Sequence, residues 1–205
     1  EADRVNGWNL TSDASPSFAD TSDADVLTAV GLGIASGDGN GLFHPDKGIT
    51  RQEAAVMLYN TLKVMGAPIQ GVGSSFTDQE SIAAWAEEPV SAIVGWGVMN
   101  GTGDGSIFSP DGTATRAMVA TVLYRMSGET TGAAADAAKT FSDVGANQWY
   151  AAAVDWAADN GIVTGYNGKF NPNANITRQD MATMLYRYAQ YKKDDVRKTN
   201  DLAAF

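Results

Sequence analysis

Ile176-Thr177-Arg178-Gln179-Asp180-Met181-Ala182-Thr183-Met184-Leu185-Tyr186 is the third copy of a stretch that occurs three times in the 205 residues. The earlier copies run over 49–59 and 114–124. In each copy a Thr-Arg pair is followed at the same spacing by Ala, Leu and Tyr, and Arg51, Arg116 and Arg178 are 65 and then 62 residues apart. Self-similarity at a nearly constant period is typical of a chain built from repeated units, so the sequence predicts three of them.

Each copy of this stretch has the pattern of a helix N-terminus. Thr50 with Glu53, and Thr177 with Asp180, have the spacing of a capping box, in which the shorter Asp is a weaker partner. Met118 takes that place in the middle copy and leaves only the threonine half. Apolar residues then recur at helical spacing, so we expect a helix to begin after each threonine.

Further motifs recur in the same order ahead of each Thr-Arg pair. They are Phe-x-Asp (18–20, 76–78, 141–143), a helical stretch, Gly-x-x-x-Gly (33–37, 97–101, 161–165) and Phe-x-Pro (43–45, 108–110, 170–172). The first glycine of each pair is expected to end the first helix in the left-handed conformation. The helical stretches of units two and three contain Trp85 and Trp149. Unit one has no such tryptophan, and its shorter spacing predicts a first helix that lacks about a turn and a half.

Composition excludes several classes of protein. A net charge of −10 and a pI near 4.4 argue against nucleic-acid binding, which needs a basic face, and against a polybasic membrane-surface protein. No apolar run reaches the roughly 18 residues of a membrane span, so no membrane insertion is expected. The chain has no cysteine, which excludes a disulfide scaffold. Units of about 60 residues would be marginal alone, so we expect the three to pack into one body.

Taken together, the five ordered motifs resemble the S-layer homology (SLH) family over roughly residues 18–190. The resemblance implies an all-α, pseudo-threefold body (a pseudotrimer) of three helical repeats joined by Gly/Pro-rich loops and formed by one monomeric chain. It implies an anchoring module of a bacterial surface protein, extracellular and non-enzymatic. Its implied partner is secondary cell-wall polysaccharide, typically with pyruvate ketals on the terminal sugar, with S-layer or other surface proteins as further partners.

The same resemblance implies the binding residues. In the family the grooves lie between adjacent units, the arginine of the Thr-Arg motif contacts the acidic sugar, and the glycine that closes the first-helix loop borders the groove. The implied ligand-binding residues are Arg51, Arg116, Arg178, Gly37, Gly101 and Gly165. The chain departs from the family pattern in the first helix of unit one and at Ala114 and Met118, which flank Arg116.

The arginines can also be interpreted from the residues alone. Each follows the cap directly, where the helix dipole disfavours a cation, so each should have a partner. One interpretation is a salt bridge to a local carboxylate, such as the Phe-x-Asp aspartates. The other is an external carboxylate or phosphate, assisted by free N–H groups at the helix start. On the residues alone the two are equally supported, and the resemblance favours the external ligand.

The remaining candidates receive structural interpretations. Asp20, Asp78 and Asp143 are expected to cap helices, and Trp85 and Trp149 to fill the core. His44 is the one histidine and has no equivalent in the other units, so neither a general base nor a metal ligand is expected there. No nucleophile–base set, Walker loop or metal-ligand cluster is present in the sequence, and we expect no catalytic residue, metal or other cofactor. The rival functions are a glycoside hydrolase with two carboxylates and a protein-interaction module.

The predicted organisation has five segments. They are a lead-in segment (1–17), repeat one (18–66), repeat two (76–128), repeat three (141–190) and a C-terminal extension or linker (191–205).

Overall fold

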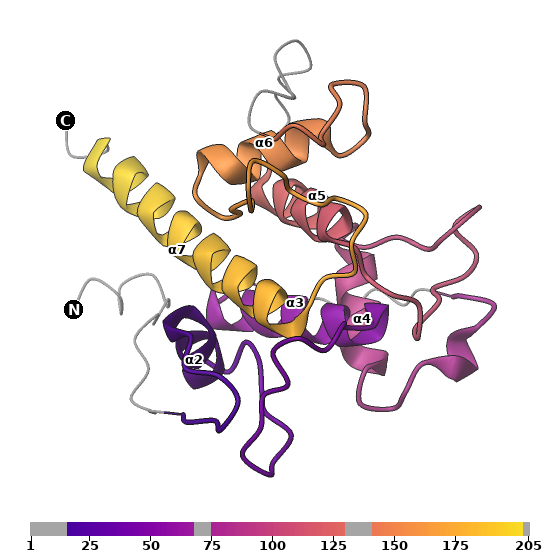
Figure 1. Cartoon of the computed structure of the whole chain (residues 1–205). Helices are drawn as coiled ribbons and strands as arrows, with labels where there is room; N and C mark the ends of the chain where they lie inside the picture. The colour runs from indigo at the N-terminus through magenta and orange to yellow at the C-terminus, as the bar shows by residue number, and fades with distance from the viewer. Residues whose placement is uncertain (1–15, 68–74, 130–140, 203–205) are drawn as a thin grey trace.

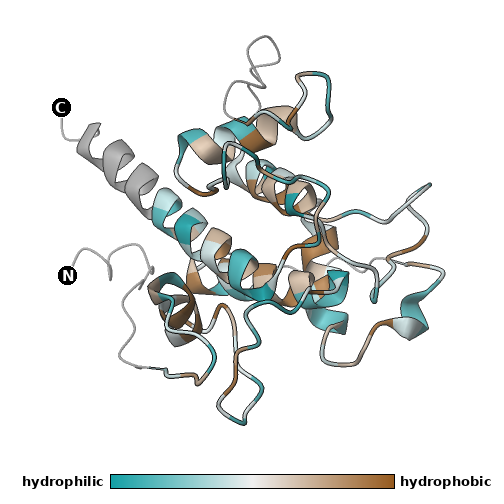
Figure 2. Cartoon of the chain, in the orientation of Figure 1, coloured by the Kyte–Doolittle hydropathy of each residue, from teal (hydrophilic) through white to brown (hydrophobic). Residues whose placement is uncertain are grey.

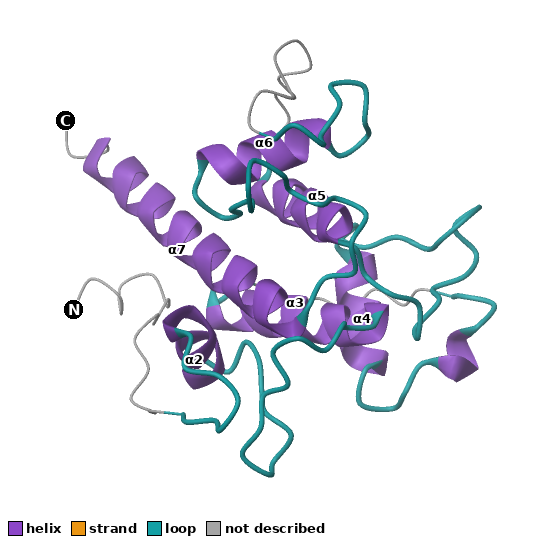
Figure 3. Cartoon of the chain, in the orientation of Figure 1, coloured by secondary structure: helices purple, strands orange, loops and turns teal. Residues whose placement is uncertain are grey.

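The computed structural model describes residues 16–67, 75–129 and 141–202, with side chains to residue 192. The described α-helices are α2 (Ala24–Gly31), α3 (Arg51–Val64), α4 (Glu87–Gly95), α5 (Arg116–Ser127), α6 (Ala151–Asp159) and α7 (Arg178–Leu202), with a short 3-10 turn, η1 (Gln79–Ser81). Within this part of the chain the only β-structure is isolated bridges (Figure 3). The prediction of an all-α fold is confirmed.

The second helix of each unit begins where the sequence predicts. Thr50 accepts a hydrogen bond from Glu53 N, and the Glu53 carboxylate accepts one from Thr50 N, which completes a capping box. Thr115 caps α5 through Met118 N. Thr177 accepts from Asp180 N at 3.1 Å, but the Asp180 carboxylate is used elsewhere, so the predicted capping box of α7 is only half formed.

The first helices end as expected but begin differently. Gly33, Gly97 and Gly161 have φ of 80°, 67° and 68°, the left-handed conformation that terminates a helix. However, α2 has eight residues against nine in α4 and in α6, so the prediction that unit one lacks a turn and a half of helix is wrong. The extra residues of units two and three form the turns before α4 and α6.

Helix pairs form across unit boundaries. α3 of unit one packs on α4 of unit two, α5 of unit two packs on α6 of unit three, and α7 of unit three packs on α2 of unit one (Figure 1). Each first helix therefore lies against the second helix of the preceding unit. The order is cyclic, because α7, the last described helix, packs on α2, the first described one.

The three units meet in a closed triangle of backbone hydrogen bonds. Ile49 N donates to Ile176 O, Ile176 N donates to Ala114 O, and Ala114 N donates to Ile49 O, at 3.2, 2.9 and 3.3 Å. All three residues are buried and precede the capping threonines. The second helices therefore start from one common centre, which is the pseudo-threefold arrangement that the family resemblance implies.

One hydrophobic core cluster includes residues of all three units, and the helices carry both hydrophobic and hydrophilic residues along their lengths (Figure 2). None of the described helices is long and apolar enough to cross a membrane. The predicted boundary at residue 190 falls inside α7, which continues to Leu202. Most of the lead-in segment and residues 68–74, 130–140 and 203–205 lie outside the described residues.

Candidate functional site

The three arginines of the Thr-Arg pairs make the same contacts with the following unit. In each case Nε donates to the carbonyl of a Phe-x-Pro phenylalanine, Nη2 donates to the carbonyl before a loop glycine, and the guanidinium lies over that phenylalanine ring. The acceptor pairs are Phe108 O and Asn100 O for Arg51, Phe170 O and Thr164 O for Arg116, and Phe43 O and Ser36 O for Arg178. Each arginine therefore holds the loops of the following unit in place.

These backbone carbonyls are partners that sequence reasoning missed, because a carbonyl oxygen has no signature in the sequence. A guanidinium has five N–H donors. Nε and one Nη2 hydrogen are used in Arg51 and in Arg178, and Nη1 of both has no acceptor among the described residues. Burial lowers the pKa of Arg51, and the nearby Asp78 carboxylate opposes that shift. The result is a rigidly held guanidinium with one unused edge.

The expectation of free backbone N–H groups at these helix starts is wrong. The first two amides of each helix donate to carbonyls of the neighbouring loop, at distances of 2.8–3.1 Å. The pairs are Arg51 and Gln52 with Gly112 and Pro110, Arg116 and Ala117 with Ala174 and Pro172, and Arg178 and Gln179 with Lys47 and Pro45. An anion at this site would therefore be held by the side chain and not by the helix terminus.

The Phe-x-Asp aspartates do not cap helices, which corrects the sequence-based expectation. Each carboxylate accepts hydrogen bonds from two successive backbone amides of the Phe-x-Pro loop, at 2.7–2.8 Å. The pairs are Asp20 with Phe43 and His44, Asp78 with Phe108 and Ser109, and Asp143 with Phe170 and Asn171. The second residue of each pair has a left-handed φ of 57–58°. The aspartate thus holds a backbone conformation that non-glycine residues rarely adopt.

The loop glycines are needed for close packing. A Cβ on Gly37 would lie 2.3 Å from the Phe18 ring, and one on Gly165 would lie 2.3 Å from the Phe141 ring. A Cβ on Gly101 would lie 2.1 Å from the carbonyl oxygen of Gly105. Gly37, Gly101 and Gly165 directly follow the carbonyls that accept from Nη2, so they position those acceptors. Of the three, Gly101 also lines a cavity beside Arg51.

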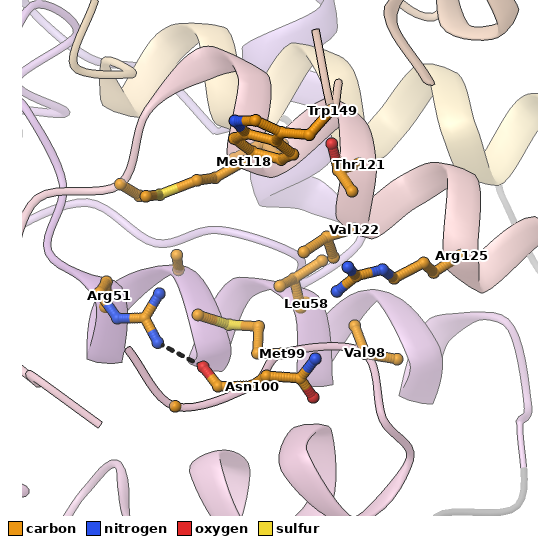
Figure 4. Close-up of a pocket in the computed structure, with 14 residues that line it drawn as sticks. Arg51, Leu58, Val98, Met99, Asn100, Met118, Thr121, Val122, Arg125 and Trp149 are labelled. Atoms are coloured by element: carbon orange, nitrogen blue, oxygen red, sulfur yellow. Dashed lines mark hydrogen bonds between the residues drawn. The ribbon is translucent and has the colours of Figure 1, made fainter. Parts of the chain in front are cut away.

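A cavity of about 250 Å³ lies beside the unused edge of Arg51 (Figure 4). We call it the Arg51 groove; its polar and aromatic lining includes Arg51, Asn100, Thr121, Arg125 and Trp149, with Met118 on one wall. Leu58, Met99 and Val122 supply apolar surface. The lining comes from α3, from the loop after α4, from α5 and from the turn before α6, so residues of all three units contribute.

A second cavity, of about 220 Å³, is its repeat equivalent and is called the Arg178 groove. Arg178 takes the place of Arg51, Ser36 that of Asn100, and Trp85 that of Trp149. Two positions differ in charge: Glu53 stands where the Arg51 groove has Met118, and Asn60 stands where it has Arg125. The structure thus brings two of the three predicted arginines to matching cavities.

Trp85 and Trp149 do not fill the core, contrary to the expectation from sequence. Their side chains are 57% and 64% exposed, and each lies in the turn before its helix, at the wall of a groove. Unit one has no tryptophan at the equivalent position. The exposed indole faces are of the kind that can stack on a sugar ring.

The third position, which we call the Arg116 site, has different electrostatics. Nη1 of Arg116, the group left unused in the other two arginines, forms an ion pair with Asp180. Arg187, the equivalent of Arg125, forms an ion pair with Asp25 of α2, with N···O distances of 2.9 and 2.8 Å. Both cations are thus neutralised within the chain.

No group of three His, Asp or Glu side chains in the described residues could hold a metal ion. The Nε2 atom of His44 lies 3.1 Å from a carboxylate oxygen of Asp38. Asp38 itself accepts hydrogen bonds from Asn40 N and Leu42 N, and these bonds lower the pKa of its carboxyl to about 2. The Asp38 loop is therefore a tight turn.

The S-layer homology domain matches the chain at residues 12–55, 75–118 and 140–182. Over 169 residues the chain is 31% identical to the "Surface-layer 125 kDa protein" of Lysinibacillus sphaericus, covering 79% of the chain and 13% of that protein. It is 27% identical over 157 residues to "S-layer protein sap" of Bacillus anthracis (75% and 18%). It is 34% identical over 117 residues to an "Uncharacterized cell wall amidase" of Bacillus anthracis (55% and 21%).

The chain thus spans between 13% and 21% of the length of these three relatives. The matched domain and the S-layer relatives assign it to the extracellular surface of a bacterium, in the cell wall or its surface layer. One match falls in each of the three units and ends within that unit's second helix, and the chain belongs to the S-layer homology domain family.

Proposed function

We propose that the chain is a non-covalent wall-anchoring module that binds acidic, pyruvylated secondary cell-wall polysaccharide in the grooves between its units. The ligand's carboxylate would be held by Arg51 in one groove and by Arg178 in the other. Arg116 is the third ligand-binding candidate and is the weakest, because Asp180 occupies its Nη1 group. Gly37, Gly101 and Gly165 serve the grooves by positioning the carbonyls that fix each guanidinium.

The observation that carries this proposal is the unused Nη1 edge of Arg51 and of Arg178 beside a cavity. Nε and Nη2 are already bonded to carbonyls, so the guanidinium loses little freedom when it binds a ligand. A carboxylate at the open edge would form charge-assisted hydrogen bonds, which are stronger than hydrogen bonds between neutral groups. A pyruvate ketal presents such a carboxylate directly on a sugar ring.

The walls of the grooves suit a carbohydrate. An exposed indole stands at each groove, Trp149 in one and Trp85 in the other, and apolar side chains supply part of the lining. A sugar could place its apolar face on the indole while its acidic substituent reaches the arginine. The combination favours an acidic sugar over a simple inorganic anion.

The rival reading as a glycoside hydrolase has weaker support. A retaining or inverting hydrolase needs one carboxylic acid with a raised pKa. Although desolvation raises the pKa of Asp78 and of Asp143, backbone hydrogen bonds outweigh it and leave both pKa values lowered. The amidase relative shares only 21% of its length with the chain. We therefore propose that the chain binds wall polymer without cleaving it.

The ring of contacts closes within one chain, so we propose that the module acts as a monomer. Its partners would be the polysaccharide and, through the rest of the protein that carries it, other surface-layer proteins. A purely protein-binding groove remains the alternative that the experiment below distinguishes.

The test blocks one groove without touching its arginine. Met118→Asp places a carboxylate where Asp180 stands beside Arg116, and it should pair with Arg51 and lower affinity for a pyruvylated disaccharide at that groove. Met118→Leu is the matched control. Calorimetry with the same disaccharide lacking pyruvate should give no binding. Shortened wall polymer after incubation, or binding that is insensitive to pyruvate, would contradict the proposal.

A further inference from the structure

The two open grooves differ at one charged position that the proposed function does not use. Arg125 lines the Arg51 groove, and Asn60 occupies the same place in the Arg178 groove. Figure 4 shows Arg51 and Arg125 pointing into the cavity from opposite ends, with Leu58 and Val122 between them. The Arg51 groove therefore contains two guanidinium groups.

Among the residues that the structure describes, Arg125 has no carboxylate partner. It is exposed on α5, and no hydrogen bond or ion pair of its side chain is found among the described residues. Its equivalent in unit three, Arg187, contacts Asp25 through both Nε and Nη2. This helix position thus holds a paired arginine in unit three and an asparagine in unit one. In unit two it holds an arginine that has no partner among the described residues and that lies beside an open groove.

The acidic side chains near the grooves increase this contrast. Of the described residues that line the Arg51 groove, none is Asp or Glu, since Met118 occupies the position of Glu53. Asp78 interacts electrostatically with Arg51 but is not among the residues that line the groove, and its oxygens already accept hydrogen bonds from the amides of Phe108 and Ser109. In the Arg178 groove, Glu53 lines the same cavity as the single arginine and also binds Thr50 and Lys47. One groove is dicationic, and the other is close to neutral.

We propose that Arg125 makes the Arg51 groove specific for a sugar segment with two acidic groups, whereas the Arg178 groove takes a segment with one. This inference rests on the proposed function. Two guanidinium groups facing the same cavity repel each other when it is empty, and a ligand with two carboxylates relieves that repulsion while pairing with both. A ligand with one carboxylate would leave Arg125 unpaired.

The experiment measures each groove separately in the intact chain. The probes are a disaccharide with a pyruvate ketal on one sugar and the same disaccharide with a ketal on both. The indole N–H signals of Trp149 and Trp85, assigned with Trp→Phe variants, report the Arg51 and Arg178 grooves in an NMR titration. The quantity of interest is the ratio of affinities for the two probes at each signal.

In the wild-type chain, the Trp149 signal should show about tenfold preference for the doubly acidic probe, and the Trp85 signal little preference. Arg125→Asn should remove the preference at Trp149, and Arg125→Lys should retain part of it. The double variant Glu53→Met/Asn60→Arg copies the two charge-determining positions of the Arg51 groove and should create the preference at Trp85. Higher salt should reduce every such preference.

The inference is overturned if Arg125→Asn changes affinity for both probes by the same factor, or if the double variant gains no preference. Circular dichroism of each variant checks that the helices are intact. If neither probe shifts either indole signal in the wild-type chain, the proposed function itself fails. The two failures are therefore distinguishable.

Discussion

Arg178 donates its Nε hydrogen to the carbonyl oxygen of Phe43 at 2.9 Å, although 135 residues separate them. The contact repeats those of Arg51 with Phe108 and of Arg116 with Phe170, and it joins the last unit to the first. The same closure is seen in the packing of α7 on α2. Residues proposed to bind ligand are thus also the residues that connect the units.

We predict that the chain unfolds in a single cooperative transition, because each helix pair and each arginine contact joins two different units. The calorimetric and van't Hoff enthalpies should agree. A chain that ends at residue 140 lacks α6 and α7 and leaves α5 and α2 without their partners, so its remaining helices should largely melt. Two separate transitions, or native helicity in the shortened chain, would show that the units are independent.

The two hydrogen bonds that Asp78 accepts from the Phe108 and Ser109 amides should contribute stability that is lost in acid. Desolvation raises the pKa of Asp78 in the folded state, but backbone hydrogen bonds outweigh it and leave the pKa lowered. The contribution is therefore present above the unfolded value of 3.8 and is lost as pH falls through the lower folded pKa. Asp78→Asn replaces one acceptor oxygen by an NH₂ group and should cost about 1 kcal/mol at neutral pH, after solvent screening.

Urea unfolding at pH 7 and at pH 3 would measure this effect, with the exposed Asp46 changed to Asn as the control. The difference between Asp78→Asn and the wild type should shrink at the lower pH. An equal difference at both values would mean that the carboxylate charge is not what holds the left-handed Ser109 backbone.

The three arginines should not be equally important for binding. Replacing Arg51 or Arg178 by Ala should cost more affinity than replacing Arg116, because Nη1 of Arg116 is already paired with Asp180. Loss of one charge-assisted contact should cost about 2–3 kcal/mol at its own groove. Calorimetry with a pyruvylated disaccharide would give the order, with native helicity confirmed since each arginine also holds a loop. If only Arg116→Ala abolished binding, the ranking would be reversed.

Asp180→Met should release the Nη1 group of Arg116 and increase ligand binding at the Arg116 site. Met is the residue at the equivalent position beside Arg51. The lost ion pair is partly solvent-exposed and should change stability by no more than about 1 kcal/mol. The measurement is the binding stoichiometry for the pyruvylated disaccharide. Asp159→Met, which removes the same charge from an exposed position, is the control; equal effects of the two variants would assign the gain to net charge alone.

Local features of this chain were predictable from its sequence. The threonine caps, the left-handed glycines after the first helices and the starts of α3, α5 and α7 follow from side chains within a few residues of each other. The repeat itself indicated three similar units. These are short-range rules, and the resemblance to the S-layer homology family supplied the pseudo-threefold assembly.

The electrostatics of the grooves could not be predicted, because they depend on contacts between units. Glu53, Met118 and Asp180 share one position in the repeat, yet one completes a capping box, one faces an open groove and one neutralises an arginine. The prediction that Trp85 and Trp149 fill the core was wrong for a related reason. Helical spacing indicates a buried face, but these residues precede the helices and project at the groove walls.

The central claim is that the grooves bind an acidic wall polymer, and co-sedimentation with purified bacterial walls tests it most directly. The fraction of the chain pelleted is measured before and after chemical removal of the secondary polysaccharide. The chain should pellet with intact walls and stay in solution with stripped ones. Equal pelleting with both preparations would contradict the claim.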